Sequence, residues 1–164
     1  MNIVKGDLFQ DKDSILLHCV SADFAMGAGI ALQFVNHFPG MKGRMIQHFD
    51  DYDIPPKDRV GSHYLHRHYD EAMERDRFIV NLITKERYNW KPTYMSLAKS
   101  LISARDDLIF MFRDPLFLSE NPSPLKIAMP KIGCGLDQLD WNAVKAIIHT
   151  CFPEDQFEIT IYEK

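Results

Sequence analysis

SILLHCVSADFAMGAGIALQFVNHF, residues 14–38, is the segment that predicts the fold of this chain. It opens with a continuous apolar run over residues 14–20, which is typical of a buried central strand. Residues 28–38 then carry apolar side chains at helical spacing, and Pro39 and Gly40 follow as a helix stop. The glycines between the two patterns allow a sharp turn and let backbone N–H groups approach a ligand. A strand, a glycine loop and a helix N-terminus in this order suit the binding of phosphate.

A second segment of the same kind is MPKIGCGLD, residues 129–137. It also follows a short apolar run and precedes a helical pattern. Either loop alone could be a simple tight turn, because a single Gly-x-Gly is weak evidence for a binding site. Two such loops at the ligand-binding edge of one sheet would suit a ligand with two phosphates.

The remaining sequence alternates strand and helix patterns. Further strands are predicted over residues 2–5, 61–69, 77–83, 125–129 and 157–162, and further helices over residues 41–52, 93–111 and 141–151, the last with Asp140 as its N-cap. Residues 6–9 are expected to form a turn, residues 55–58 a loop and residues 112–124 an irregular excursion. This order predicts one α/β domain over residues 1–164, with three layers and a central mixed sheet. Ligands of such sheets bind at the carboxyl ends of the strands, where both glycine loops fall.

Composition excludes several classes of protein. The 164 residues are 46% hydrophobic and 26% charged, which is an ordinary balance for a globular domain with a real core. The net charge of −4 argues against a basic nucleic-acid-binding surface. Cys19, Cys134 and Cys151 are odd in number and show no CxxC spacing, and no signal-peptide pattern opens the sequence, so we expect an intracellular protein. No apolar stretch approaches the roughly 20 residues of a membrane-spanning helix.

Four residues could carry chemistry, and each also has a purely structural interpretation. Lys85 ends a hydrophobic strand pattern, where partial desolvation would favour the neutral, nucleophilic amine, but most lysines in such a position only begin a solvated loop. Asp137 could position protons or merely close a turn. The spacing around Asp7 favours a turn aspartate that caps N–H groups over an acceptor for an exocyclic amine such as that of adenine. Cys134 has no neighbour in sequence that would lower its pKa, so a packing role is favoured over a nucleophilic one.

The histidines His63, His66 and His68 raise the question of a metal site. His66 and His68 would share one face of a strand. No carboxylate or cysteine completes a metal-binding pattern with them, so we expect an exposed polar strand face and no metal site.

Four stretches together resemble a known family. They are VKGDLF (4–9), HCVSADFAMGAGIA (18–31), NLITKERYNWKPTY (81–94) and MPKIGCGLDQLDW (129–141). Their order and combination are similar to those of the macrodomains, which are three-layer α/β/α modules that bind ADP-ribose. Within that family the chain resembles the terminal ADP-ribose glycohydrolase type, in the ALC1-like branch.

The resemblance implies an enzyme that removes ADP-ribose from glutamate or aspartate side chains and deacetylates O-acetyl-ADP-ribose, without a metal or cofactor. The family's catalytic lysine matches Lys85, which would attack C1″ of the distal ribose. Its assisting aspartate matches Asp137, which would help to resolve the covalent intermediate. The glycine loops and the resemblance together give the expected ADP-ribose-binding residues: Asp7, Leu8, Ser21, Met26, Gly27, Gly29, Ile30, Ile132, Gly133, Cys134, Gly135, Leu136 and Tyr162.

Two alternative functions remain open at this point. One is an ADP-ribose-1″-phosphate phosphatase and the other a non-catalytic reader of ADP-ribosylated proteins. Lys85 and Asp137 together favour a hydrolase over a reader, whereas only the LITK match argues against the phosphatase. The expected partners are ADP-ribose and ADP-ribosylated proteins, with nucleic acid only as an ADP-ribosylated substrate, and a monomer is expected.

Overall fold

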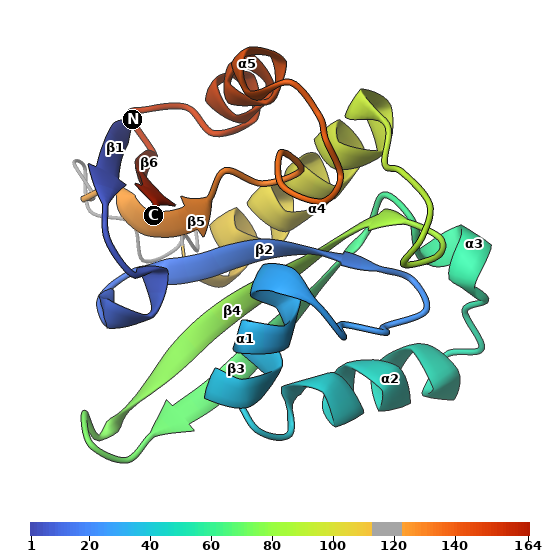
Figure 1. Cartoon of the computed structure of the whole chain (residues 1–164). Coiled ribbons are helices and arrows are strands. Elements are labelled where there is room, and N and C mark those ends of the chain that lie inside the picture. The colour runs from blue at the N-terminus through green and yellow to red at the C-terminus, as the bar shows by residue number, and fades with distance from the viewer. Residues whose placement is uncertain (113–122) are drawn as a thin grey trace.

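A computed structural model of the chain describes residues 1–112 and 123–164, and its centre is a six-stranded sheet in the order β1-β6-β5-β2-β4-β3 (Figure 1). The strands are β1 (Asn2–Lys5), β2 (Ile15–Ser21), β3 (His63–Asp70), β4 (Arg75–Lys85), β5 (Leu125–Pro130) and β6 (Phe157–Glu163). Only β3 runs antiparallel to its neighbour; the other pairs are parallel. The sheet is therefore mixed, as predicted.

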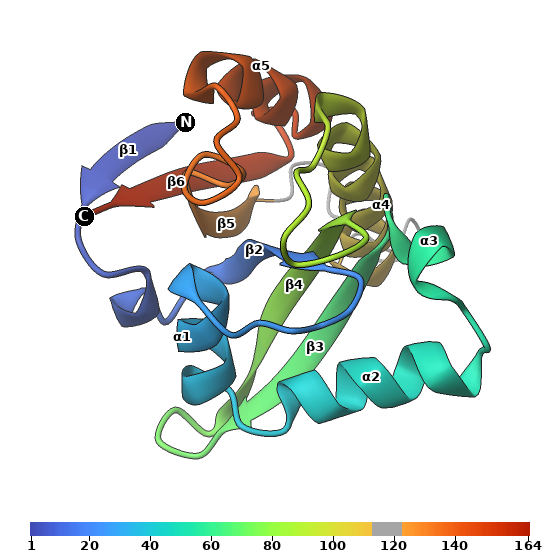
Figure 2. The same cartoon turned by 45° about the vertical axis from the view of Figure 1, so that its right-hand side comes forward.

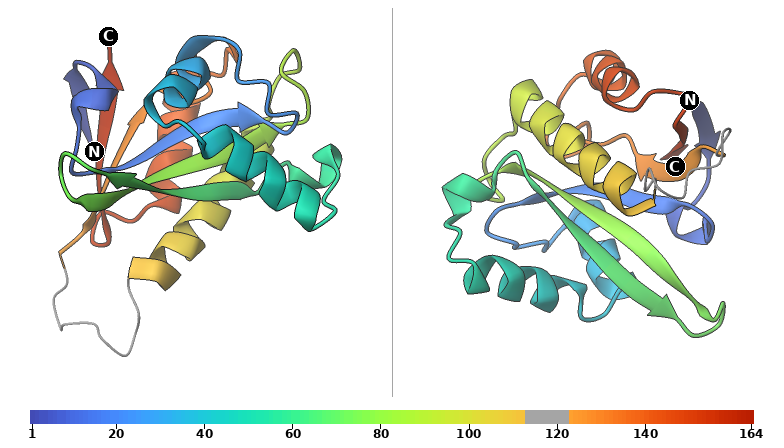
Figure 3. Two further views of the ribbon diagram at one scale, coloured as in Figure 1. Left: turned by 90° about the horizontal axis from the view of Figure 1, so that it is seen from below. Right: turned by 180° about the vertical axis from the view of Figure 1, so that it is seen from behind.

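Helices cover both faces of this sheet, which confirms the three-layer α/β prediction. The helices are η1 (Leu8–Gln10, a 3-10 turn), α1 (Gly29–His37), α2 (Met41–Asp51), α3 (Pro56–Arg59), α4 (Tyr94–Phe112) and α5 (Trp141–Cys151). Helices α1 and α2 lie on one face and α4 and α5 on the other, as Figures 2 and 3 show from different sides. Within the described ranges, no helix is both long and apolar enough to cross a membrane.

The central strand β2 explains why residues 14–20 are apolar without alternation. Leu16 packs with Phe34 and Met45 in the core beneath α1 and α2. Its neighbour Leu17 points to the other face and packs with Leu97 in the core beneath α4 and α5. Both leucines are fully buried, because a strand covered on its two faces needs apolar side chains in both directions.

Several predicted segments change in type or in their bounds. Residues 56–59 form the short helix α3 instead of a loop, because Pro56 at the first helical position has the backbone geometry of a helix start. Strand β4 continues to Lys85, so this lysine is the last residue of a strand and not the first of a loop. Of the predicted excursion over residues 112–124, Phe112 closes α4, and residues 113–122 lie outside the described residues.

The prediction of an exposed histidine face on β3 is wrong. His66 is only 3% exposed and shares the inner face towards α1 and α2 with His68, at a ring distance of 5.8 Å. His63 points to the opposite face, where its ring nitrogens lie 2.7 Å from Ser103 Oγ and 2.7 Å from Asp107 Oδ2 of α4. Strand alternation thus separates His63 from His66 and His68, and the described residues contain no group of three potential metal ligands.

Candidate active site

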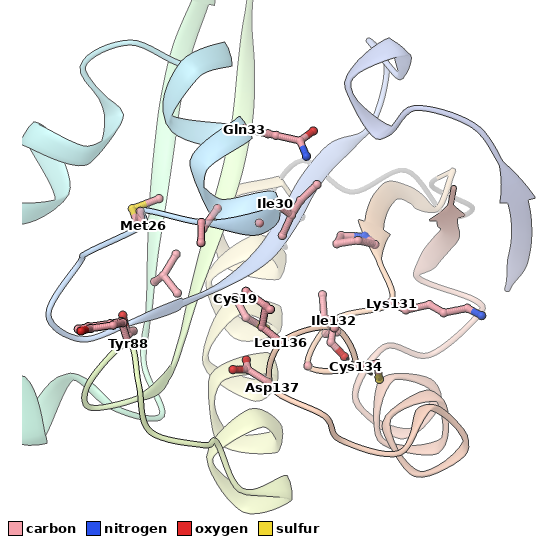
Figure 4. Close-up of a pocket in the computed structure, with 18 of the residues that line it drawn as sticks. Cys19, Met26, Ile30, Gln33, Tyr88, Lys131, Ile132, Cys134, Leu136 and Asp137 are labelled. Carbon is pink, nitrogen blue, oxygen red and sulfur yellow. Dashed lines mark hydrogen bonds between the residues drawn. The ribbon is translucent and has the colours of Figure 1, made fainter.

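The two glycine loops meet at one edge of the sheet and enclose a cavity of about 790 Å³. The loop after β2 and the loop after β5 come together there because β2, β4 and β5 are parallel, so their carboxyl ends share this edge. In the view of Figure 4, Met26 and Tyr88 lie on one side of the cavity and Ile132 and Cys134 on the other. The volume falls within the range of about 300–1,000 Å³ that is typical of small-molecule pockets.

Lys85 and Asp137 form an ion pair inside this cavity. The Lys85 Nζ donates to Asp137 Oδ1 at 2.5 Å, and the two side chains are only 13% and 14% exposed. Lys85 is the last residue of β4, and Asp137 lies in the loop after β5, so the fold brings together residues that are 52 positions apart. An amine beside a carboxylate in a partly enclosed cavity is an arrangement that can carry out nucleophilic and proton-transfer chemistry.

The two cysteines in the cavity are poor nucleophiles. Burial and the Asp137 carboxylate raise the pKa of Cys19 to about 12. Burial, followed by the nearby Asp140 carboxylate, also raises the pKa of Cys134, whose Sγ lies 3.3 Å from the Ile132 carbonyl oxygen. Neither thiol is activated, in agreement with the packing role predicted for Cys134.

The first glycine loop is held in a strained backbone conformation. Phe24 and Met26 adopt φ values of 53° and 46°, which L-residues with side chains rarely do. Their side chains are buried, and the Arg59 guanidinium lies over the Phe24 ring while it donates to the Ala22 carbonyl. The core and this arginine therefore fix the loop before any ligand arrives.

Asp23 connects the first glycine loop to the segment that follows Lys85. Its carboxylate accepts hydrogen bonds from Ser21 Oγ at 2.5 Å, from Ala25 N at 3.1 Å and from Tyr88 N at 2.9 Å. Burial disfavours the ionised form, but these hydrogen bonds outweigh it and keep the pKa of Asp23 below its usual value. One carboxylate thus ties together two segments that border the cavity.

Both glycine loops line the cavity and contain backbone N–H groups that have no acceptor among the described residues. The N-cap of α1, Ala28, supplies no side-chain hydrogen bond, so the N–H groups of the first turn remain available. In the second loop, the N–H groups of Gly135 and Leu136 have no acceptor elsewhere in the described part of the chain. Such groups, together with the positive end of the helix dipole, can bind an anion.

The glycines of the loops do not all have the same role. Gly29 and Gly133 have φ values of 59° and 71°, where a side chain would be strained. Gly135 has an ordinary φ, and a Cβ built on it meets no atom within 4 Å. The absence of a side chain at Gly135 therefore leaves room in the cavity, and the loop conformation does not require it.

A second cavity of about 390 Å³ adjoins the first and contains Asp7 and Leu8. The two cavities share lining residues, among them Ile30 and Tyr162. Asp7 Oδ1 accepts from Phe9 N at 2.9 Å and so caps η1, as the turn interpretation predicted. The Tyr162 hydroxyl donates to Asp11 at 2.9 Å, which fixes its ring beside this second cavity.

The structure brings nearly all of the predicted site residues into the first cavity. These are Ser21, Met26, Gly27, Gly29, Ile30, Lys85, Ile132, Gly133, Cys134, Gly135, Leu136, Asp137 and Tyr162, with Asp7 and Leu8 in the adjoining one. Sequence reasoning missed Cys19, Gln33, Tyr88 and Lys131 as lining residues. It also missed Asp23 as the connection between loops, since no local pattern shows that its carboxylate reaches residue 88.

Comparisons with known proteins agree with this geometry. No protein-family model matches the chain. It is 35% identical over 160 residues to the human and bovine proteins named "ADP-ribose glycohydrolase OARD1", covering 97% of this chain and 88% of each relative.

Solved structures show the same fold. The macrodomain of Mycobacterium tuberculosis DarG matches with a TM-score of 0.79 at 21% identity, over 99% of this chain and 97% of that one. Thermosipho africanus DarTG, solved in complex with ADP-ribose, matches with a TM-score of 0.73 at 18% identity, over 98% of this chain and 40% of that one.

Proposed function

Because this chain belongs to the macrodomain family, as a relative of the ADP-ribose glycohydrolases, we propose that it is a hydrolase that releases ADP-ribose from acidic side chains of proteins. The diphosphate would lie between the two glycine loops, and the adenine end would extend towards the second cavity. The same site would deacetylate O-acetyl-ADP-ribose, which carries a comparable ester.

The observation that carries this proposal is the ion pair of Lys85 and Asp137 within the cavity. The attack needs Lys85 as a neutral amine, which arises when its ammonium loses a proton to water. The free Nζ then bonds to C1″ of the distal ribose while the bond between C1″ and the carboxylate oxygen breaks. The glutamate or aspartate leaves as a carboxylate, and Asp137 supports the later attack by water that frees Lys85.

The backbone of the glycine loops would hold the diphosphate. The uncapped first turn of α1 and the N–H groups of Gly135 and Leu136 provide donors on both sides of the cavity. Backbone donors and a helix dipole can bind phosphate without lysines, which agrees with the net charge of −4.

Product analysis with three substrates tests the proposal. They are a protein ADP-ribosylated on glutamate, an ADP-ribosylated DNA and ADP-ribose-1″-phosphate. We expect free ADP-ribose from the first substrate as the main activity. Turnover of only the 1″-phosphate would make the chain a phosphatase, and tight ADP-ribose binding without any turnover would make it a reader.

A further inference from the structure

The short segment that follows Lys85 carries exposed aromatic and cationic side chains, and Leu136 of the second glycine loop lies beside it. We call this surface the rim; it consists of Arg87, Tyr88, Trp90, Lys91, Tyr94 and Leu136. Tyr88 is 67% exposed and Leu136 is 71% exposed, and both also line the cavity. Large apolar side chains gathered at the mouth of a cavity indicate a binding surface more than ordinary surface composition does.

Contacts within the rim hold it in place. The Tyr88 N–H is bound by Asp23, the Lys91 Nζ donates to the Leu136 carbonyl at 2.5 Å, and the Tyr94 hydroxyl accepts from Asp140 N at 3.1 Å. The loop between β4 and α4 therefore lies beside the loop that follows β2, as Figure 2 shows, and is also tied to the loop after β5. A surface fixed in this way loses little conformational entropy when a partner binds.

The two cations of the rim, Arg87 and Lys91, have no carboxylate partner among the described residues. The Arg87 guanidinium lies 5.2 Å from the Trp90 ring centre, and the Lys91 ammonium donates to a backbone carbonyl. Of the nearby acids, Asp137 pairs with Lys85, Asp23 accepts from three donors and Asp140 caps α5. Each of these carboxylates therefore has partners other than the two cations of the rim. Arg87 and Lys91 are thus available to carboxylates of a bound partner, on a chain whose net charge is negative.

We propose that the rim binds the polypeptide that carries the ADP-ribose, and that it favours segments with further carboxylates next to the modified residue. This inference rests on the proposed function: if the distal ribose reacts at Lys85, the attached chain leaves the cavity across the segment that directly follows Lys85. Carboxylates of that chain then meet Arg87 and Lys91, and its apolar parts meet Tyr88 and Trp90. A peptide is favoured over a nucleic acid because two cations do not make the extended basic surface that a phosphate backbone needs.

Hydrolysis rates of matched peptides test this surface. Three peptides of equal length, each ADP-ribosylated on one glutamate, would carry acidic, neutral or basic flanking residues, and O-acetyl-ADP-ribose would serve as a substrate without a carrier chain. We expect kcat/KM to be roughly three- to tenfold higher for the acidic peptide than for the neutral one, which is the size of effect that a few exposed charge contacts produce. For the basic peptide, kcat/KM should be lower than for the neutral one. Added salt should reduce the difference.

A paired set of variants assigns the effect to the rim. The double variant Arg87→Gln with Lys91→Gln should lose the preference for acidic flanks and keep its rate on O-acetyl-ADP-ribose. The control, Arg44→Gln with Lys145→Gln, removes the same charge from exposed positions on α2 and α5 and should keep the preference.

The possible outcomes distinguish failure of this inference from failure of the proposed hydrolase function. Equal rates for all three peptides, with O-acetyl-ADP-ribose still hydrolysed, would overturn the rim and leave the hydrolase. Absence of both hydrolysis and ADP-ribose binding would overturn both. A third outcome is that an ADP-ribosylated oligonucleotide reacts faster than the acidic peptide. If Trp90→Ala removes this advantage and the charge variant keeps it, the rim binds nucleic-acid bases by stacking and not a polypeptide.

Discussion

Lys85 and Asp137, which are 52 residues apart in sequence, meet at 2.5 Å in a cavity bordered by two glycine loops. The parallel arrangement of β2, β4 and β5 produces this meeting, because it places the end of β4 and the loop after β5 at the same edge of the sheet. A pair of charged groups that is more than four-fifths buried is costly unless it is well paired, so its position in a cavity favours a chemical role.

Gly135→Val should remove ADP-ribose binding and leave the fold intact. The glycine has an ordinary φ and open space around its missing Cβ, so the valine side chain would occupy only the space of the ligand. We expect the affinity measured by calorimetry to fall at least about tenfold, which corresponds to about 1.4 kcal/mol. Gly43→Val, at an equally open position on α2, is the control; unchanged affinity in a folded Gly135→Val protein would remove the second loop from the site.

Asp7→Ala should weaken ADP-ribose binding by the loss of one charged hydrogen bond, roughly 1.5–3 kcal/mol. Because Asp7 also caps η1, the variant needs a control that loses only a cap. Asp140→Ala removes the comparable cap of α5 away from the second cavity. If both variants bind ADP-ribose as tightly as the wild type, Asp7 has only its structural role.

Cys134→Ser should retain turnover within about threefold of the wild type. The raised pKa of this thiol leaves little thiolate at neutral pH, so the sulfur does not act as a nucleophile and its replacement by oxygen should change the rate little. Steady-state rates on a glutamate-linked substrate check this expectation. A loss as large as that of Lys85→Ala would transfer the chemistry from the lysine to the cysteine.

Stability should fall as the pH drops from about 6.5 to about 4, because of His18. Burial lowers the pKa of His18 to about 4, and its ring stacks on Phe34 and lies 2.6 Å from Asn81 Oδ1. The unfolded chain binds a proton at this position below pH 6.5, whereas the folded chain does so only near pH 4, so acid favours unfolding across that window. A shift of this size corresponds to about 3 kcal/mol.

Urea unfolding at several pH values measures this effect. His66, whose pKa burial and the nearby His68 and Arg44 also lower to about 4, adds to the slope in the wild type. His18→Gln should be less stable at pH 7 and lose less stability between pH 7 and pH 5. An identical pH slope in the variant would show that His18 does not cause it.

Much of the fold could be predicted from local patterns. The alternation of strand and helix patterns along the chain predicts a mixed sheet with helices on both faces. The burial of His66 could not be predicted, because β3 is rich in polar residues and its sequence does not show which face is buried. That face is buried because α1 and α2 pack against it, and this packing is a tertiary feature. The helix α3 was missed because two consecutive prolines are also typical of a loop.

The candidate site could be predicted where a motif marks it. The glycine loops, Lys85 and Asp137 each stand in a recognisable stretch of sequence. Asp23 and Tyr88 stand beside such stretches, but their link is a hydrogen bond between segments 65 residues apart. No periodicity or spacing encodes such a contact, so only the folded structure reveals it.

The release of ADP-ribose by Lys85→Arg from a protein modified on glutamate is the most direct test of the central claim. Arginine keeps the positive charge beside Asp137 but cannot become a neutral amine at physiological pH. We expect Lys85→Arg and Lys85→Ala to be inactive while they still bind ADP-ribose, and Asp137→Ala to accumulate a Lys85–ADP-ribose adduct that mass spectrometry detects. Substantial turnover by Lys85→Arg would contradict the account, because Lys85 would then supply only charge and not the nucleophile.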